Sequence, residues 1–261
     1  MGVKYGEMLA RQKNSNVLVF SIGNGGEAHG PALFHDTDSF FAMTAATDAA
    51  RRTGAIYAGH IPFTTDGVGD IAKSWAPAYL PLEKFYALSL KFVKSVVEEN
   101  ARILQKGSLF GGEGLRIVIV VGHGGIPGDF GGIIQKKIGI ETACVFPGEE
   151  FGMHAGDEEH SLLKYLGHFK EGGLREIHKF AKEKGPEEAL RRWPPLLGLS
   201  GFWFLEDSER KYGKDFWVLG RYAKESRILD FLAEGKIHVD SRRGREIYEG
   251  FMAEVVKAIE G

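Results

Sequence analysis

Four short apolar runs in this chain each end in or just before a polar cluster, and this arrangement limits the possible folds more than any other feature. The runs lie at 17–23, 55–61, 115–121 and 141–146. The first is continuously apolar rather than alternating, as expected for a strand covered on both faces. In a parallel α/β sheet the carboxyl ends of the strands share one edge, where ligands bind. Side chains that are far apart in the sequence should therefore meet at that edge.

The polar clusters are rich in carboxylates and imidazoles, which are common ligands of divalent metal ions. The candidates, in chain order, are Glu27, His29, His35, Asp36, Asp38, His60, His123, His154 and Glu159. Glu27 and His29 are two positions apart, so in an extended loop both side chains point to the same side. Asp38 alone fits a helix N-cap as well as a metal ligand, and its acidic and histidine neighbours favour the ligand. His60 fits a buried histidine at a strand end better than a ligand.

The two later clusters differ in how strongly they indicate a metal. His123 lies in the loop 122–125, whose glycines let the backbone approach a ligand closely. The spacing of this loop matches neither a P-loop nor a dinucleotide-binding fingerprint, and we interpret His123 as a metal ligand. The acids at 157–159 open a predicted helix, where they also suit the helix dipole. Together the clusters indicate a metal-dependent hydrolase.

Helical spacing alternates with the strand-like runs. We expect helices from near Asp38 to Gly54 and over about 82–106, 130–138 and 241–259. The alternation predicts an α/β fold, namely a three-layer αβα sandwich with a mostly parallel central sheet.

The length of 261 residues suits a single domain, 1–261. An aromatic-rich excursion at about 190–225 is either a flap that packs on the ligand-binding edge or on another subunit, or an ordinary layer over the core.

Composition narrows the functional classes. The net charge of -2 does not favour nucleic acid or an acidic membrane surface as a partner. No apolar run is long enough to span a bilayer and the N-terminus lacks a signal-peptide core, so we expect a cytoplasmic protein. Cys144 is the single cysteine and lies in an apolar run, which favours a role in the core over that of a nucleophile.

The motifs resemble those of the creatininase family of metal-dependent amidohydrolases, which includes creatinine amidohydrolase and an archaeal formylaminopyrimidine deformylase. The matching segments, in the family's order, are Glu27-x-His29-Gly-Pro with Asp38, Gly122-His123-Gly-Gly, and His154-Ala-Gly-x-x-Glu159. The resemblance covers roughly residues 15–165. It implies a single α/β domain with a parallel sheet, two metal ions, and symmetric oligomers that are often hexamers.

The resemblance also implies which side chains bind the ions. The two implied sets are Glu27, Asp38 and His123 for one ion, and His29, Asp38 and Glu159 for the other. Asp38 would bridge the ions, and His154 would contact the substrate or transfer protons.

The sequence departs from the family pattern at three places. Val121 and Ile126 stand where the family's Gly-His-Gly-Gly motif usually has flanking Asn residues. Gly125 stands where creatininase has an additional carboxylate ligand, which implies looser binding of one metal. The segment 64–75 replaces the usual Phe-Pro-Gly-Thr loop. The substrate therefore does not follow from the resemblance.

We expect hydrolysis of a non-peptide C–N bond in a small cyclic amide or formamide, by water that two divalent ions (Zn, Mn or Fe) activate. His154 is the expected general acid, because an imidazole pKa lies near neutral pH. Candidate substrate contacts are Ser74, Trp75, Glu150 and Gly124. The alternatives are a ring-opening hydrolase of a cyclic sugar ketone such as an inosose, and an inactive homologue that binds a metal or ligand.

Overall fold

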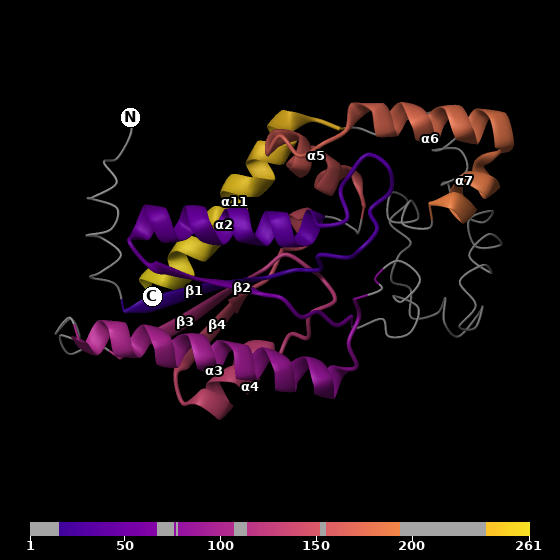
Figure 1. Ribbon diagram of the computed structural model, residues 1–261. Helices are drawn as coiled ribbons and strands as arrows, with labels where there is room; N and C mark the ends of the chain where they lie inside the picture. Colours follow the sequence, from indigo (N-terminus) through magenta and orange to yellow (C-terminus); the bar gives the residue numbers. More distant parts are fainter. Residues whose placement is uncertain (1–15, 67–75, 77, 107–113, 152–154, 194–238) are drawn as a thin grey trace.

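A four-stranded parallel sheet forms the centre of the computed structural model, which describes residues 16–66, 76, 78–106, 114–151, 155–193 and 239–261 (Figure 1). Its strands are β1 (Val17–Ile22), β2 (Ile56–Ile61), β3 (Arg116–Val121) and β4 (Glu141–Val145). Their order across the sheet is β2-β1-β3-β4. The four predicted strands are thus confirmed, with ends shifted by one residue.

Helices follow the strands as the alternation predicts. The α-helices are α2 (Thr37–Thr53), α3 (Leu82–Lys106), α4 (Phe130–Ile138), α5 (Asp157–Tyr165), α6 (Glu171–Lys184), α7 (Pro186–Arg192) and α11 (Ser241–Glu260), with a short 3-10 helix at Glu149–Phe151. Gly54 ends α2 in the left-handed conformation, with φ 82°, as expected of a glycine just past a helix. The N-cap interpretation of Asp38 is wrong: Asp36 occupies the N-cap position, and Asp38 lies inside the first turn.

Helices cover both faces of the sheet (Figure 1). Val17 and Val19 of β1 face the layer that contains α2, α5 and α11. Leu18 and Phe20 face the layer that contains α3 and α4. Because successive side chains of a strand point to opposite faces, a continuously apolar strand can supply both cores at once. The fold is therefore the predicted three-layer αβα sandwich.

The strand order creates a switch point between β1 and β3. From β1 the chain passes through α2 to β2 on one side, and it returns through α3 to β3 on the other side of β1. The loops that follow β1 and β3 therefore diverge from one crevice at the carboxyl ends of the strands. Ligands of open α/β sheets bind at such crevices.

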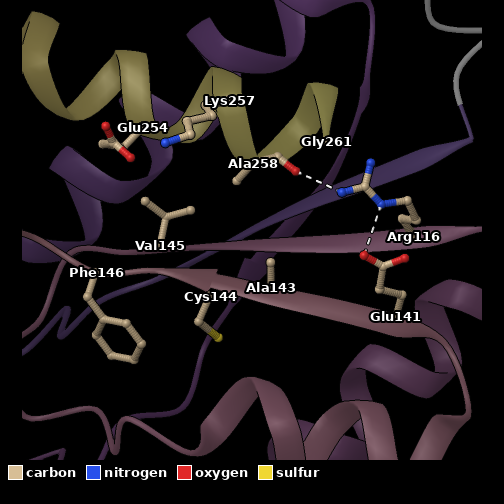
Figure 2. A pocket seen from close by; sticks show the side chains of 10 residues that line it. All are labelled: Arg116, Glu141, Ala143, Cys144, Val145, Phe146, Glu254, Lys257, Ala258 and Gly261. Atoms are coloured by element: carbon tan, nitrogen blue, oxygen red, sulfur yellow. Dashed lines mark hydrogen bonds and ion pairs between the residues drawn. The ribbon is translucent and has the colours of Figure 1, made fainter.

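A pocket lies elsewhere, along the outer edge of β4 and beneath the end of α11 (Figure 2). Arg116 closes one end of it: the guanidinium donates to the carbonyl of Ala258 at 3.1 Å and lies 3.5 Å from Glu141 Oε1. None of the candidate metal ligands lines this pocket. Within the described residues, we find no helix that combines the length and the apolar character needed to cross a membrane.

Candidate metal centre

The carboxyl edge of the sheet holds a buried cluster of acidic and histidine side chains. Its members, with their exposed fractions, are Glu27 2%, His29 1%, Asp38 3%, Asp66 8% and His123 5%. They form two groups that share Glu27: one with His29 and Asp38, the other with Asp66 and His123. In each group the potential ligand atoms all lie within 4.8 Å of one another. Four of the five residues were predicted from the sequence, and they come from the loops after β1 and β3 and from the start of α2.

Asp38 lies at the centre of the cluster. Its Oδ1 is 3.0 Å from Nε2 of His29, and its Oδ2 is 2.8 Å from Nδ1 of His123. Each carboxylate oxygen thus faces a different imidazole, which is the arrangement expected of a carboxylate that bridges two ions.

Glycine at the end of β3 allows Asp38 to reach this position. A Cβ at Gly122 would lie 2.3 Å from the backbone oxygen of Asp38 and 2.9 Å from the Cβ of Ala42. A Cβ atom essentially never lies within 3.0 Å of a heavy atom from a residue that is not its neighbour in the chain. The first turn of α2 can therefore pack against β3 only because position 122 lacks a side chain.

His29 is oriented by the backbone of its own loop. Its Nδ1 lies 3.0 Å from the carbonyl oxygen of Glu27. A carbonyl can only accept a hydrogen bond, so Nδ1 carries the proton and Nε2 is the nitrogen left for the cluster. Metal-binding histidines commonly have this second hydrogen bond, which selects the tautomer and holds the ring.

His123 lies between carboxylates on both sides of its ring. Nδ1 is 2.9 Å from Oε2 of Glu27, in addition to its contact with Asp38, and Nε2 is 3.4 Å from Oδ2 of Asp66. Three carboxylates therefore surround one imidazole, although a protonated imidazole carries a single positive charge.

The electrostatics of the metal-free cluster are dominated by these acids. Burial lowers the pKa of His29, but the carboxylates of Glu159 and Asp38 outweigh it and hold that pKa well above the usual value. Burial likewise lowers the pKa of His123, and Glu27, Asp38 and Asp66 raise it well above the usual value. Without a metal, both imidazoles therefore tend to hold a second proton.

The donor set fits divalent metal ions. When ionised, Glu27, Asp38, Asp66 and Glu159 carry four negative charges, of which two protonated imidazoles balance only two. Two divalent cations would balance all four with neutral imidazoles, which are the form that binds metal. Buried charges are costly unless they are paired or bind a metal. Mixed carboxylate and imidazole ligands suit Zn, Mn and Fe.

Glu159 lies at the border of the cluster, with a side chain 16% exposed. Its Oε1 is 3.6 Å from Nε2 of His29, while its Oε2 accepts a 2.6 Å hydrogen bond from the backbone of Ala155. Glu159 is the third residue of α5 and reaches back to the backbone before the helix, much as in a capping box. It therefore ties the residue before the N-cap to the first turn of α5 and also faces His29. His154, the expected general acid, lies outside the described residues.

The remaining candidates belong to neither group of potential ligands. His35 and Asp36 are exposed, and Asp36 contacts His168 at 3.4 Å. His60 lies near the end of β2, as expected, but it is half-buried rather than buried, and its Nδ1 lies 3.0 Å from Ser21 Oγ.

Two of the four expected substrate contacts lie within the described residues. Gly124 is exposed on the loop after β3, and Glu150 is exposed in the 3-10 helix after β4. Ser74 and Trp75 lie outside the described residues. Cys144 is half-buried and packs against the core beside α3 and α4, in agreement with a packing role, and burial raises its pKa to about 12.

Comparison with known proteins extends this picture. No protein-family model and no curated protein matches the sequence. Among solved structures, a mutant creatininase complexed with creatine matches with a TM-score of 0.53 and 16% identity, over 98% of this chain and 95% of that chain. A Zn-Zn form of the mutant creatininase gives the same values. A protein from Bacteroides fragilis NCTC 9343, provisionally described as a creatinine amidohydrolase, matches with a TM-score of 0.51 and 14% identity, over 94% and 89% of the two chains.

The chain has a creatininase-like fold. At this level of identity the likeness to creatininase shows the fold alone. What the protein does must therefore be argued from the chemistry of the cluster.

Asp66 is the one member of the cluster that we did not predict from the sequence. It follows β2 at the same edge of the sheet. The sequence feature that could have indicated Asp66 is its position shortly after a strand of a parallel sheet. Several other acids of the chain also follow strands, so this signal does not single out Asp66.

Proposed function

We propose that this protein is a metal-dependent hydrolase that cleaves a non-peptide C–N bond in a small polar substrate. The observation that carries the proposal is the buried cluster at the switch point, where four carboxylates and two imidazoles converge. The creatininase-like fold supports the proposal, because the solved structures that share it include a creatininase with two zinc ions.

In this proposal the cluster holds two divalent ions. Glu27, Asp38 and His123 would bind one, and His29, Asp38 and Glu159 the other. The opposite orientation of the two Asp38 oxygens, 3.0 Å from His29 and 2.8 Å from His123, supports its role as the bridge. When bound, the ions supply Lewis acidity that activates water and polarises a substrate carbonyl.

The chain itself must supply a proton to the leaving nitrogen. We assign this to His154, because imidazole exchanges protons near neutral pH. The next residue, Ala155, is buried and donates its N–H to Glu159, whose other oxygen faces His29. The backbone next to His154 is thus connected to the cluster through a single side chain. Our proposed substrate contacts are Gly124, exposed on the loop after β3, and Glu150, exposed in the 3-10 helix after β4.

A reconstitution experiment tests the function. The protein is freed of metal, loaded with Zn or Mn, and incubated with creatinine and other cyclic amides, with N-formyl compounds and with cyclic sugar ketones. We expect release of an amine or a ring-opened acid that depends on the metal and is abolished in Asp38→Asn but not in Asp36→Asn. If only the sugar ketones were turned over, the assigned reaction would be ring opening and not C–N cleavage. Equal turnover with and without metal would contradict the proposal.

A further inference from the structure

The loop after β2 brings a carboxylate into the cluster that the family resemblance does not supply. Asp66 is 8% exposed, and its Oδ2 lies 3.4 Å from Nε2 of His123. Asp66, Glu27 and His123 each offer a ligand atom, and these atoms lie within 4.8 Å of one another. We propose that Asp66 is a further metal ligand, acting with Glu27 and His123, and that Gly125 leaves the space that its carboxylate needs. This inference rests on the proposed metal-dependent function and extends its ligand set.

The backbone holds Asp66 in place from a second segment. Leu80 donates its N–H to the carbonyl of Thr64 at 3.0 Å, and the hydroxyl of Thr65 donates to the carbonyl of Leu80 at 2.8 Å. Thr64 also forms a β-bridge with Tyr79. The two residues before Asp66 are therefore tied to the chain just ahead of α3, and both are buried. Such support restricts the position of the carboxylate, as a metal ligand requires.

Position 125 must be a glycine for this arrangement to exist. A Cβ built on Gly125 would lie 2.7 Å from Cγ of Asp66 and 2.5 Å from Nε2 of His123. At the adjacent Gly124, a Cβ would meet nothing within 4 Å. The loop after β3 therefore lacks a side chain at the position where the Asp66 carboxylate approaches His123.

A simpler role for Asp66 would be to pair with a protonated His123. That imidazole already has Glu27 at 2.9 Å and Asp38 at 2.8 Å on its other nitrogen. Even two protonated imidazoles do not balance the four carboxylates of the cluster. A divalent cation between Glu27, Asp66 and the imidazole does account for them, because it adds the missing positive charge and uses oxygen and nitrogen ligands together.

Asp66→Asn tests the proposal, since it removes the charge without changing the size of the side chain. Zn²⁺ is titrated into the metal-free protein in competition with a chromophoric chelator. We expect the affinity for one ion to fall by more than about a hundredfold, which is beyond the usual loss of an outer hydrogen-bonding partner. The readout that separates a ligand from a structural role is the rise in melting temperature on adding Zn²⁺, which should be smaller in the variant than in the wild type. A purely structural role would lower the melting temperature with and without Zn²⁺ by the same amount and leave that rise unchanged. Asp36→Asn, an exposed carboxylate two residues from Asp38, is the control.

A second pair of variants keeps the test independent of Asp66→Asn. Gly125→Ala should weaken the same ion, because its methyl group displaces both Asp66 and His123, while Gly124→Ala should leave Zn²⁺ affinity unchanged. Wild-type Zn²⁺ affinity in both Asp66→Asn and Gly125→Ala would overturn the inference and leave the proposed function standing. Failure of the wild-type protein to bind Zn²⁺ would instead overturn the proposed function.

Discussion

Asp38→Asn should separate the two roles of the central carboxylate, as a metal bridge and as the charge partner of two imidazoles. The substitution keeps the size of the side chain and removes its charge. Each Asp38 oxygen faces one imidazole, at 3.0 Å and 2.8 Å. Loss of the bridge should therefore affect both ions, so that binding of at least one is abolished and turnover disappears.

The effect on the metal-free protein follows from the pKa of Asp38. Burial raises this pKa, but His29 and His123 outweigh it and lower it from 3.8 to about 2. At about 1.4 kcal/mol per pKa unit, the ionised carboxylate contributes about 2 kcal/mol to the free energy of unfolding. Because the pKa is lowered, this stability is present above about pH 4 and is lost as the pH falls towards 2. Asp38→Asn should therefore lower the melting temperature by about 4–8 °C at neutral pH.

Two assays check the two parts of this prediction. Elemental analysis after loading with Zn²⁺ and gel filtration measures the number of ions per chain. Thermal unfolding of the chelated proteins, followed by circular dichroism from pH 7 downwards, should show the difference from wild type narrowing below about pH 4. Asp36→Asn should match wild type in metal content. If Asp38→Asn kept the full metal content and Asp36→Asn lost it, the first motif would have been read two residues out of register.

Three further perturbations address other parts of the site. His154→Ala should keep metal and fold while turnover of an identified substrate falls by about a hundredfold or more; loss of metal would make His154 a ligand. Gly122→Ala places a methyl group 2.3 Å from the backbone oxygen of Asp38. It should therefore lower the free energy of unfolding by about 1–3 kcal/mol and weaken Zn²⁺ binding. Gly124→Ala should change neither the free energy of unfolding nor Zn²⁺ binding. Chelation of the wild-type protein should lower its melting temperature, because free Zn²⁺ at a hundred times its Kd stabilises a one-site protein by about 2.7 kcal/mol; an unchanged melting temperature would argue against a bound ion.

The fold could be predicted from the sequence because its strands carry an unusually direct signal. The 17–22 and 116–121 segments are apolar at every or nearly every position, and both faces of the sheet are covered by helices. Such strands belong in the middle of a parallel sheet. The exact start of α2 could not be predicted, because Asp36 and Asp38 are equally good N-cap residues in sequence. In the structure Asp36 occupies the N-cap position, and Asp38 lies in the first turn, where its backbone packs against Gly122.

The site was predicted where its residues form compact motifs and missed where they do not. Glu27, His29 and Asp38 lie within twelve positions, and His123 sits in a glycine-rich loop. Asp66 has no such motif around it. Its role depends on the approach of the β2 loop to Gly125, a contact between segments about sixty residues apart that no local pattern encodes.

The proposed role of Asp66 beside Gly125 also bears on how metal sites of this kind could diverge. β2 and β3 lie on either side of β1, so the loops that follow them reach the same edge of the sheet from opposite sides. A metal ion responds to the position and charge of a ligand oxygen and not to the segment that carries it. A carboxylate can therefore come from either loop, provided that the other loop gives up its side chain, as Gly125 does. Such an exchange would also change the shape of both loops. Metal chemistry can thus be retained while the substrate changes, so binding of two ions by this protein would not by itself identify what it hydrolyses.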